Sequence, residues 1–290
     1  MEVFVPMTER YAGKNVIVTG SGTGIGREVA LQFAREGANV VLHYAHSSAG
    51  AESAVEEIKK MGRKATAIKA NFGDVEDVKR FGREAIAFLG KVDALVNNAG
   101  ITFNKPYYEV TVEQFDMMYN VNIKAQYFLG QVIAEHMEKN GGGAILNVTS
   151  IHGVSGAPEH SVYAGTKGAI IAFTRSIAVE MAHKGVRFNA LAPGSVQVEN
   201  YYKACPGYDP EASQKAMADM IPCGYQGVPS DMATVATFLC SEEARFIVGQ
   251  TIVADGGTTA LMSLIRDFRH RSDCAFGADY LPGVKPVERK

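Results

Sequence analysis

Short apolar runs and amphipathic segments alternate along most of the chain. The apolar runs are rich in β-branched residues and end in Gly, Asn, Ser or Asp: 15–20, 39–44, 65–70, 93–100, 143–150, 186–194 and 250–257. Between them, apolar positions recur at helical spacing in 24–36, 48–61, 74–89, 111–138, 161–183 and 230–241. Because near-continuous apolar runs suit strands that are buried on both faces, this alternation predicts a parallel sheet. The expected fold is α/β: a doubly wound parallel sheet of about seven strands, flanked by helices, in a single domain.

Two segments fall outside this alternation. The stretch 195–229 contains four prolines and one candidate short helix at 210–220. A long loop inside a compact domain is usually functional, so we predict that 195–229 is a lid segment. We expect 1–257 to form the domain and 258–290 to form a C-terminal extension, packed on the domain or on a neighbouring subunit.

Composition and charge narrow the class of protein. The formal net charge is −2, which provides no strong positive field for nucleic acid or an anionic membrane. No run approaches the ~18–20 apolar residues of a membrane span, and "MEVFVPMTERY" lacks the apolar core of a signal peptide. The four cysteines have no CxxC spacing, and His43 and His46 fall at a strand end. We therefore predict reduced thiols, no metal site and a cytoplasmic protein.

The first apolar run ends in "TGSGTGIG" (19–26), and a helix is predicted directly after it. Glycines at 20, 24 and 26 allow a tight turn, and a helix N-terminus offers free N–H groups to a pyrophosphate. Ligands of open α/β sheets bind beyond the carboxyl ends of the strands, where this turn lies. A glycine-rich turn without a ligand is the alternative, but this context favours nucleotide binding.

A second motif, "SVYAGTKGAI" (161–170), places a tyrosine four residues before a lysine. On a helix, Tyr163 and Lys167 lie on one face, and an ammonium beside a phenol lowers a pKa that is otherwise about 10. Such a tyrosine can act as an acid or base near neutrality, although one such pair is also expected by chance.

In their order along the chain, these motifs resemble those of the short-chain dehydrogenase/reductase family over residues 10–257. Besides the glycine-rich turn, the resemblance includes "NNAG" (97–100), "NVNI" (120–123), "NVTS" (147–150), "YAGTK" (163–167), "LAPGSV" (191–196) and "ADGG" (254–257). It implies that 1–257 is a Rossmann-type catalytic and dinucleotide-binding domain.

The resemblance also implies the catalytic residues, position by position. Tyr163 is the acid or base, and Ser150 hydrogen-bonds the substrate oxygen. Lys167 grips the nicotinamide ribose, and Asn122 holds a water in a proton relay, with Asn120 as the weaker alternative. All four positions hold the family's residue, which argues against a protein that kept the fold and lost turnover.

Contacts to the cofactor and the substrate follow from the same resemblance. The predicted cofactor-binding residues are Gly20, Ser21, Thr23, Gly24, Ile25, Gly26, Tyr44, Ser47, Asn71, Phe72, Asn98, Ala99, Gly100, Tyr163, Lys167, Pro193, Gly194 and Val196. The predicted substrate-binding residues are Ser150, His152, His160, Tyr163, Gln197 and Tyr201. The chain departs from the family at Gln197, where a threonine often bonds the carboxamide, and at Asn71, where an aspartate usually lies beside the adenine.

The expected function is an NAD(P)(H)-dependent oxidoreductase that interconverts a secondary alcohol and a ketone on a small-molecule substrate. The mixed polar and aromatic pocket gives a slight preference for a sugar, polyol or sugar acid. A 3-oxoacyl thioester or small-ketone reductase is the alternative. A nucleotide-binding sensor or scaffold without turnover is the alternative from a different class.

NADP(H) is expected to be preferred, with NAD(H) also possible. An NAD-specific enzyme of this fold places a carboxylate at the end of the second strand, where it would repel a 2′-phosphate. Here that position is Tyr44, and Ser47, Ser48, His43 or His46 could contact a phosphate. No arginine lies in this stretch, so the preference should be about tenfold, or roughly 1.4 kcal/mol. It should weaken at higher pH if a histidine carries part of the positive charge.

The family resemblance also implies a homotetramer or a homodimer. The stretches "AQYFLGQVIAEHM" (125–137) and "AIIAFTRSIAVEM" (169–181) are too apolar for helices with one buried face, which fits subunit contacts.

Overall fold

The computed structural model of this protein describes residues 9–199, 207–262 and 269. Seven parallel strands form one sheet in the order β3-β2-β1-β4-β5-β6-β7. The strands are β1 (Asn15–Val18), β2 (Asn39–Tyr44), β3 (Ala65–Lys69), β4 (Ala94–Asn97), β5 (Gly143–Val148), β6 (Val186–Pro193) and β7 (Thr251–Ala254). The prediction of a single-domain, doubly wound α/β sheet is therefore confirmed.

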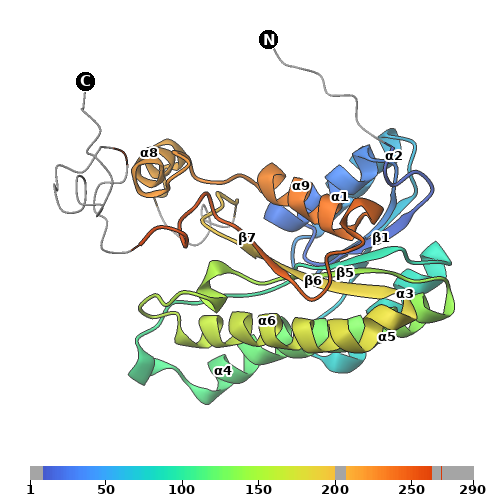
Figure 1. Cartoon of the computed structure of the whole chain (residues 1–290), viewed down its shortest axis with the longest axis horizontal. Helices are drawn as coiled ribbons and strands as arrows, with labels where there is room; N and C mark the ends of the chain where they lie inside the picture. Colours follow the sequence, from blue (N-terminus) through green and yellow to red (C-terminus); the bar gives the residue numbers. More distant parts are fainter. Residues whose placement is uncertain (1–8, 200–206, 263–268, 270–290) are drawn as a thin grey trace, which may run out of the picture.

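Helices cover both faces of the sheet (Figure 1). One face carries α1 (Gly24–Arg35), α2 (Ser48–Lys60) and α9 (Pro229–Cys240). The other face carries α3 (Val75–Leu89), α5 (Ala125–Lys139) and α6 (Ser161–Met181). The helix predicted at 210–220 is α8 (Pro210–Met220), which lies to the side of both layers. Single turns occupy η1 (Tyr107–Glu109), η3 (Ile151–Gly153), η4 (Ala182–Lys184) and η5 (Glu242–Ala244).

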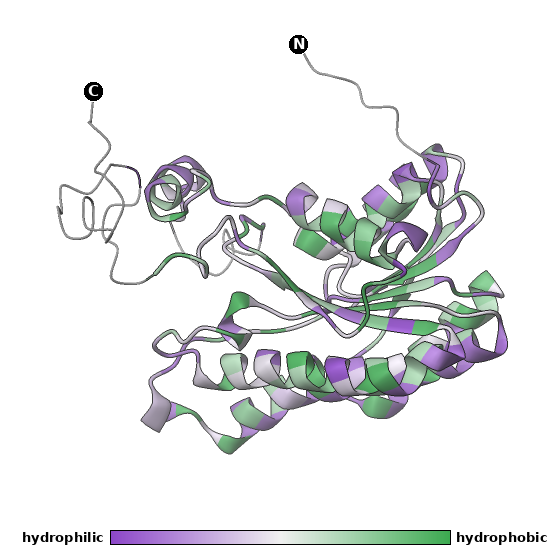
Figure 2. Cartoon of the chain, viewed as in Figure 1, coloured by the Kyte–Doolittle hydropathy of each residue, from purple (hydrophilic) through white to green (hydrophobic). Residues whose placement is uncertain are grey.

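The central strands bury successive side chains on opposite faces of the sheet. In β1, Val16 and Val18 pack on the side of α1 and α9, whereas Ile17 packs on the side of α3 and α5. All three side chains are completely buried. Figure 2 shows hydrophobic positions along the strands and hydrophilic positions along the outer surfaces of the helices. This burial on two faces explains why the strands appear in the sequence as apolar runs without alternation.

The helix predicted over 111–138 is divided in the structure. It consists of α4 (Val112–Tyr119) and α5, joined by a π-helical turn, η2 (Asn120–Lys124). In this turn the N–H of Ala125 donates to the carbonyl oxygen of Asn120, five residues earlier. A π turn inserts one residue into an otherwise regular helix, and such turns are frequent at functional sites. The spacing of apolar residues did not reveal it.

One described residue of the C-terminal extension contacts α8. The guanidinium of Arg269 lies 3.2 Å from the carboxylate of Asp219 and donates to the carbonyl oxygen of Ala218. Residues 263–268 and 270–290 of the extension lie outside the described residues, and the boundary at 257 stays a prediction.

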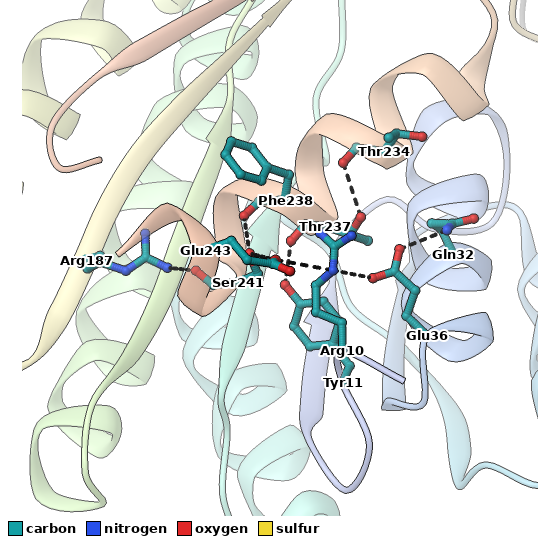
Figure 3. A network of polar contacts seen from close by, with 10 residues as sticks. All are labelled: Arg10, Tyr11, Gln32, Glu36, Arg187, Thr234, Thr237, Phe238, Ser241 and Glu243. Atoms are coloured by element: carbon teal, nitrogen blue, oxygen red, sulfur yellow. Dashed lines mark hydrogen bonds and ion pairs between the residues drawn. The ribbon is translucent and has the colours of Figure 1, made fainter. Parts of the chain in front are cut away.

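A polar network connects the segment before β1 to α1 and α9 (Figure 3). The hydroxyl of Tyr11 donates to the carbonyl oxygen of Thr237 at 2.5 Å. The guanidinium of Arg10 lies 3.2 Å from Glu36 and 3.4 Å from Glu243. These contacts hold the segment before β1 against α1, α9 and η5.

Arg187 of β6 satisfies carbonyl groups at the end of α9. Its guanidinium donates to the carbonyl oxygens of Leu239 (3.1 Å), Ser241 (2.9 Å) and Ala244 (3.2 Å). The last carbonyls of a helix have no partner within the helix, and a cation there also interacts favourably with the helix dipole. Arg187 therefore ties α9 to the sheet.

We expect Arg187→Met to lower the free energy of unfolding by about 2–4 kcal/mol, because several partly buried carbonyls lose a charged donor. Thermal unfolding followed by circular dichroism measures the effect. Arg83→Met, at an exposed position of α3, is the matched control. Equal melting temperatures for the two variants would contradict the role given to Arg187.

Candidate active site

The glycine-rich turn connects β1 to α1 at the carboxyl end of the sheet. Gly20 has a φ of +61°, a conformation that favours glycine. A Cβ on Gly26 would collide with the carbonyl oxygen of Gly20 and the side-chain nitrogen of Asn98. Thr23 is the N-cap of α1 and makes no side-chain capping bond. The turn thus forms a close backbone cradle at a helix N-terminus, which fits a dinucleotide pyrophosphate.

The end of β4 lies against this cradle. The hydroxyl of Thr19 accepts the N–H groups of Asn98 and Ala99, both at 2.9 Å. The Asn98 amide in turn donates to the carbonyl oxygen of Thr19 at 3.0 Å. The predicted residues Asn98, Ala99 and Gly100 are therefore gathered beside the glycine turn. Thr19 was not predicted, and its position directly before Gly20 is the signal that could have found it.

The start of α2 closes the other side of the cradle. A Cβ on Gly22 would lie 2.7 Å from the carbonyl oxygen of Ser47, the N-cap of α2. Tyr44 ends β2 and is partly buried. The structure thus brings Ser47, which was predicted to contact a phosphate, next to the predicted phosphate turn, three residues after Tyr44.

Ser21 and His43 need a correction. Ser21 is completely buried, its hydroxyl donates to the carbonyl oxygen of Val18 (2.8 Å), and its N–H donates to that of His43 (2.9 Å). These groups shape the turn, so they do not face a ligand. The ring of His43 is also buried, with both nitrogens bonded inside the protein. The expectation that His43 contacts a phosphate, and adds to the pH dependence of cofactor choice, is wrong.

Two predicted residues after β3 also have internal roles. Phe72 is buried and stacks on the ring of His43, with centroids 3.7 Å apart, so its side chain belongs to the core. Asn71 is exposed, and its side-chain oxygen accepts the N–H of Gly73 at 3.0 Å. Phe72 is therefore corrected from a ligand contact to a packing residue, whereas Asn71 remains at the surface beside the cradle.

Lys167 of α6 lies under the end of β5. Its ammonium donates to the carbonyl oxygen of Val148 at 3.0 Å, and its own carbonyl accepts the hydroxyl of Thr149 at 2.7 Å. Only 3% of Lys167 is exposed, and this burial lowers its pKa to about 8. A lysine with this pKa changes its charge close to neutrality, which is characteristic of a functional site.

The remaining catalytic candidates surround Lys167. Its ammonium lies 5.4 Å from the ring centroid of Tyr163, which is partly buried on the same helix face. Ser150 ends the segment after β5, and its hydroxyl accepts the N–H of His152 at 3.2 Å. The rings of His152 and His160 stack at 4.5 Å in nearly parallel planes, and that of His152 lies 5.7 Å from the Tyr163 ring. The structure thus places Lys167, Tyr163 and His152 close together, with Ser150 bonded to the backbone of His152, and their catalytic roles stay a prediction.

Asn122 lies in the π turn and is completely buried. Its side chain accepts the N–H of Ile101 (2.8 Å) and donates to the carbonyl oxygen of Ile101 (2.9 Å) and the hydroxyl of Thr166 (3.2 Å). A Cβ on Gly100 would lie 3.2 Å from the Asn122 oxygen and 3.7 Å from the Lys167 ammonium. Asn122 thus holds the turn after β4 close to Lys167, although its side chain is occupied by these bonds.

The end of β6 and the residues just after it lie where 195–229, the segment predicted to be a lid and called the lid segment below, begins. Gly194 lies against Asp255, since a Cβ at Gly194 would come within 2.6 Å of the Asp255 Cβ. Val196 is buried and pairs with Gly227 in an isolated bridge. The predicted residues Pro193, Gly194 and Val196 therefore stand where the lid segment leaves and rejoins the domain.

Gln197 serves the lid segment itself, which corrects its assignment to the substrate. Its amide donates to the carbonyl oxygen of Pro210 (3.2 Å) and the hydroxyl of Tyr208 (3.4 Å), and it accepts from the amide of Gln214 (3.0 Å). Gln214 also accepts the N–H of Gln226 at 3.2 Å. This glutamine network was not predicted, because it joins residues whose spacing carries no pattern. Tyr201 lies outside the described residues.

Other expectations concern metals and membranes. Among the residues that the structure describes, no group of three or more His, Cys, Asp or Glu side chains could hold a metal ion. No helix in this part of the chain has the length and hydrophobicity needed to cross a membrane. Cys223 is an exposed free thiol and Cys240 a buried one.

Comparisons with known proteins agree with this geometry. A family model described as enoyl-(acyl carrier protein) reductase matches residues 20–259. Tetrahydroxynaphthalene reductase from Pyricularia oryzae is 37% identical over 261 residues, which cover 87% of this chain and 92% of that protein. A solved 7α-hydroxysteroid dehydrogenase, complexed with NADH and 7-oxo glycochenodeoxycholic acid, is 34% identical with a TM-score of 0.80, covering 88% of this chain and 98% of that one. A short-chain dehydrogenase from Burkholderia cenocepacia in complex with NADP is 30% identical with a TM-score of 0.78, covering 86% and 99%.

The fold and the site define an oxidoreductase built on a dinucleotide-binding sheet. The chain belongs to the short-chain dehydrogenase/reductase family. The resemblance seen in the sequence is therefore confirmed, and with it the class of activity: an alcohol dehydrogenase or carbonyl reductase that uses NAD or NADP.

We expect Tyr163→Phe to lower kcat by a factor on the order of 10² or more, because the acid–base group is lost. The affinity for the dinucleotide should stay within about threefold, since the ring is retained. Steady-state kinetics and calorimetric titration measure the two effects. Tyr108→Phe, at a position that is 96% exposed, is the control. Near-wild-type turnover in Tyr163→Phe would refute the assignment.

The buried ammonium of Lys167 also predicts a pH dependence. Its pKa is lowered to about 8, so its charge is present below that pH and lost above it. With Tyr163 as the predicted acid, reduction would leave negative charge on its oxygen, which a charged Lys167 would stabilise. We therefore expect kcat/KM for the dinucleotide, which reports groups of the free enzyme, to fall as pH rises through about 8. In Lys167→Arg the side chain stays charged at this pH, so any residual kcat/KM should no longer fall as the pH rises through about 8.

Proposed function

We propose that this protein is an NADPH-preferring carbonyl reductase whose substrate carries its ketone on a hydroxylated ring. The observation that carries the proposal is the stacked pair His152–His160, whose rings stand at a steep angle beside the ring of Tyr163. The outer face of this stacked pair offers a flat surface for a ring. Nδ1 of His160 is bonded to the carbonyl oxygen of Pro158 at 2.8 Å, and the other ring nitrogens offer hydrogen bonds at the edge of a bound ring. Burial lowers the pKa of His152, which favours the neutral form at physiological pH.

The dinucleotide, when bound, supplies the hydride. The glycine turn, Asn98 and Ser47 would hold it, because only glycine fits the close approaches that form the cradle. In this proposal the hydroxyl of Ser150 orients the carbonyl oxygen of the substrate. Tyr163 then gives its proton to that oxygen, and Lys167 stabilises the negative charge left on the phenol oxygen.

Asn122 takes a place next to Lys167 in this scheme. Its side chain is bonded to the backbone of Ile101 and to Thr166, so a relay water would have to bond a backbone group of the π turn. The widened hydrogen-bonding pattern of a π turn leaves carbonyl groups available for such a water. Asn122 remains favoured over Asn120 because of its closeness to Gly100 and Lys167.

A sugar, polyol or sugar acid is the second candidate substrate. The polar nitrogens of His152 and His160 favour it, but the Gln197 amide is occupied by the lid segment. A ring ketone is supported further by the relatives: one is a tetrahydroxynaphthalene reductase, and one was solved with a 7-oxo steroid. A 3-oxoacyl thioester is a further alternative substrate, which the substrate panel below includes.

The proposed preference for NADPH rests on the lack of a carboxylate at the end of β2. Tyr44 occupies the position of the usual carboxylate, and Ser47 lies against Gly22 of the phosphate turn. No carboxylate is placed there to repel a 2′-phosphate. His46 is exposed and remains the histidine that could contact a phosphate.

We also propose a homotetramer or homodimer in the cytoplasm. A cavity of about 290 Å³ opens between α5 and α6, next to Tyr127 and Phe173. On α6, Val179 is 76% exposed. Apolar groups at the surface of two adjacent helices support a contact with a second copy of the chain.

A substrate panel tests the proposed function. We expect NADPH oxidation, followed by absorbance, to be fastest with hydroxylated bicyclic ketones and slower with 3-oxoacyl esters, small diketones and sugars. His152→Ala should raise KM for the ring ketone by about three- to tenfold, because one stacking surface is lost, and leave a small diketone unaffected. Turnover of sugars or polyols alone would favour the second candidate. Binding of NADPH without turnover of any substrate would support a sensor or scaffold.

With the best substrate, kcat/KM should be about tenfold higher for NADPH than for NADH, a difference of roughly 1.4 kcal/mol. Tyr44→Asp should reverse this order, since a carboxylate there repels the 2′-phosphate and accepts hydrogen bonds from the ribose of NADH. Tyr44→Phe is the matched control. An advantage for NADH in the wild type would overturn the proposed preference.

A further inference from the structure

His43 is a histidine inside an apolar strand, and it bonds both the glycine turn and the segment after β3. Its Nδ1 accepts the N–H of Gly20 at 3.1 Å, and its Nε2 lies 3.0 Å from the carbonyl oxygen of Ala70. Its backbone exchanges hydrogen bonds with Ser21, at 2.9 and 3.1 Å. A single residue of β2 thus joins the glycine turn to the segment that follows β3.

These bonds define the state of the imidazole. Nδ1 accepts from a backbone N–H and therefore carries no proton, whereas Nε2 faces a carbonyl oxygen and must donate. The ring is 2% exposed and lies between Phe72 and Phe81, at centroid distances of 3.7 and 5.2 Å. Burial lowers its pKa to about 4, which agrees with one neutral tautomer near pH 7.

The bond to Gly20 is important because of where Gly20 lies. Gly20 is the first glycine of the cradle, and its φ of +61° turns the chain back over the end of β1. Its carbonyl oxygen accepts from the Asn98 amide at 3.2 Å. Both peptide groups of this residue are therefore held by side chains, one from β2 and one from the end of β4. Without the imidazole of His43, the N–H of Gly20 would lose its side-chain partner.

We infer that His43 is a positioning residue for cofactor binding: its Nδ1 holds the N–H of Gly20 and thereby sets the shape of the phosphate cradle. This inference rests on the proposed role of the glycine turn in binding the dinucleotide. His43 does not touch the substrate or the reacting atoms. Its loss should therefore change KM for the dinucleotide and leave kcat at saturation unaffected.

Three substitutions separate this role from packing. In His43→Asn the side-chain oxygen can occupy the place of Nδ1 and accept from Gly20. In His43→Gln the amide can reach the place of Nε2 and bond Ala70 instead. His43→Leu fills much of the volume and accepts nothing. We expect Leu and Gln to raise the Kd for NADPH by about tenfold, and Asn to stay within about threefold of wild type.

Calorimetric titration with NADPH gives the affinities, and thermal unfolding gives the stability of each variant. His183→Leu, at an exposed position of η4, is the control and should match the wild type. If the Kd for NADPH follows the melting temperature rather than the presence of an acceptor for Gly20, His43 is only a packing residue. Wild-type Kd in all three variants would also overturn the inference.

Hydrogen exchange in the ligand-free protein keeps the inference separate from the proposed function. The amide of Gly20 should exchange about tenfold faster in His43→Leu than in wild type, and near the wild-type rate in His43→Asn. Equal protection of Gly20 in all variants would overturn the inference, whatever binds. If wild type itself does not bind NADPH, the proposed function fails, and the exchange result still decides whether His43 holds the turn.

Discussion

A parallel sheet that is buried on both faces has only its strand ends left for polar chemistry. In this protein the side chains of β1 alternate between two apolar layers, so no ligand can approach the faces of the strand. The carboxyl ends of β1, β4, β5 and β6 meet at one edge, where the glycine turn, Asn98, Ser150 and Gly194 follow them. The candidate site lies at these carboxyl ends, where ligands of open α/β sheets bind.

At these strand ends, many polar groups already form hydrogen bonds within the protein. Thr19 and Asn98 bond one another and the backbone around Gly20, and Ser21 bonds back to Val18. Buried polar groups must be satisfied, and here the partners come from the neighbouring strand ends. A polar residue at these strand ends can therefore bond a ligand only through donor or acceptor positions that are not used within the protein.

Around the predicted catalytic residues, burial of Lys167 has two opposing effects. Burying the ammonium of Lys167 disfavours its charged form, and one bond to the Val148 carbonyl offsets this only in part. The same burial strengthens its interaction with Tyr163, because charges attract more strongly in a poorly polarisable surrounding. Asn122 holds the turn after β4 against this pair, from a π turn that interrupts the long helix. The burial that disfavours the charged form of Lys167 thus also strengthens the interaction with Tyr163 that the proposed reaction uses.

The sequence determined what depends on local spacing. Apolar runs indicated the strands, and helical spacing indicated the helices and put Tyr163 and Lys167 on one face. Family motifs then related Ser150 and Asn122 to that pair.

Only the tertiary structure decided what depends on pairing between distant segments. It brought His43 to Gly20, the amide of Gln197 to α8, and the hydroxyl of Ser21 back into its own turn. A polar residue has the same letter in the sequence whether it faces a ligand or a backbone group. The physical reason for the difference is that hydrogen bonds form between neighbours in space, and spacing along the chain records only the neighbours within one helix or strand.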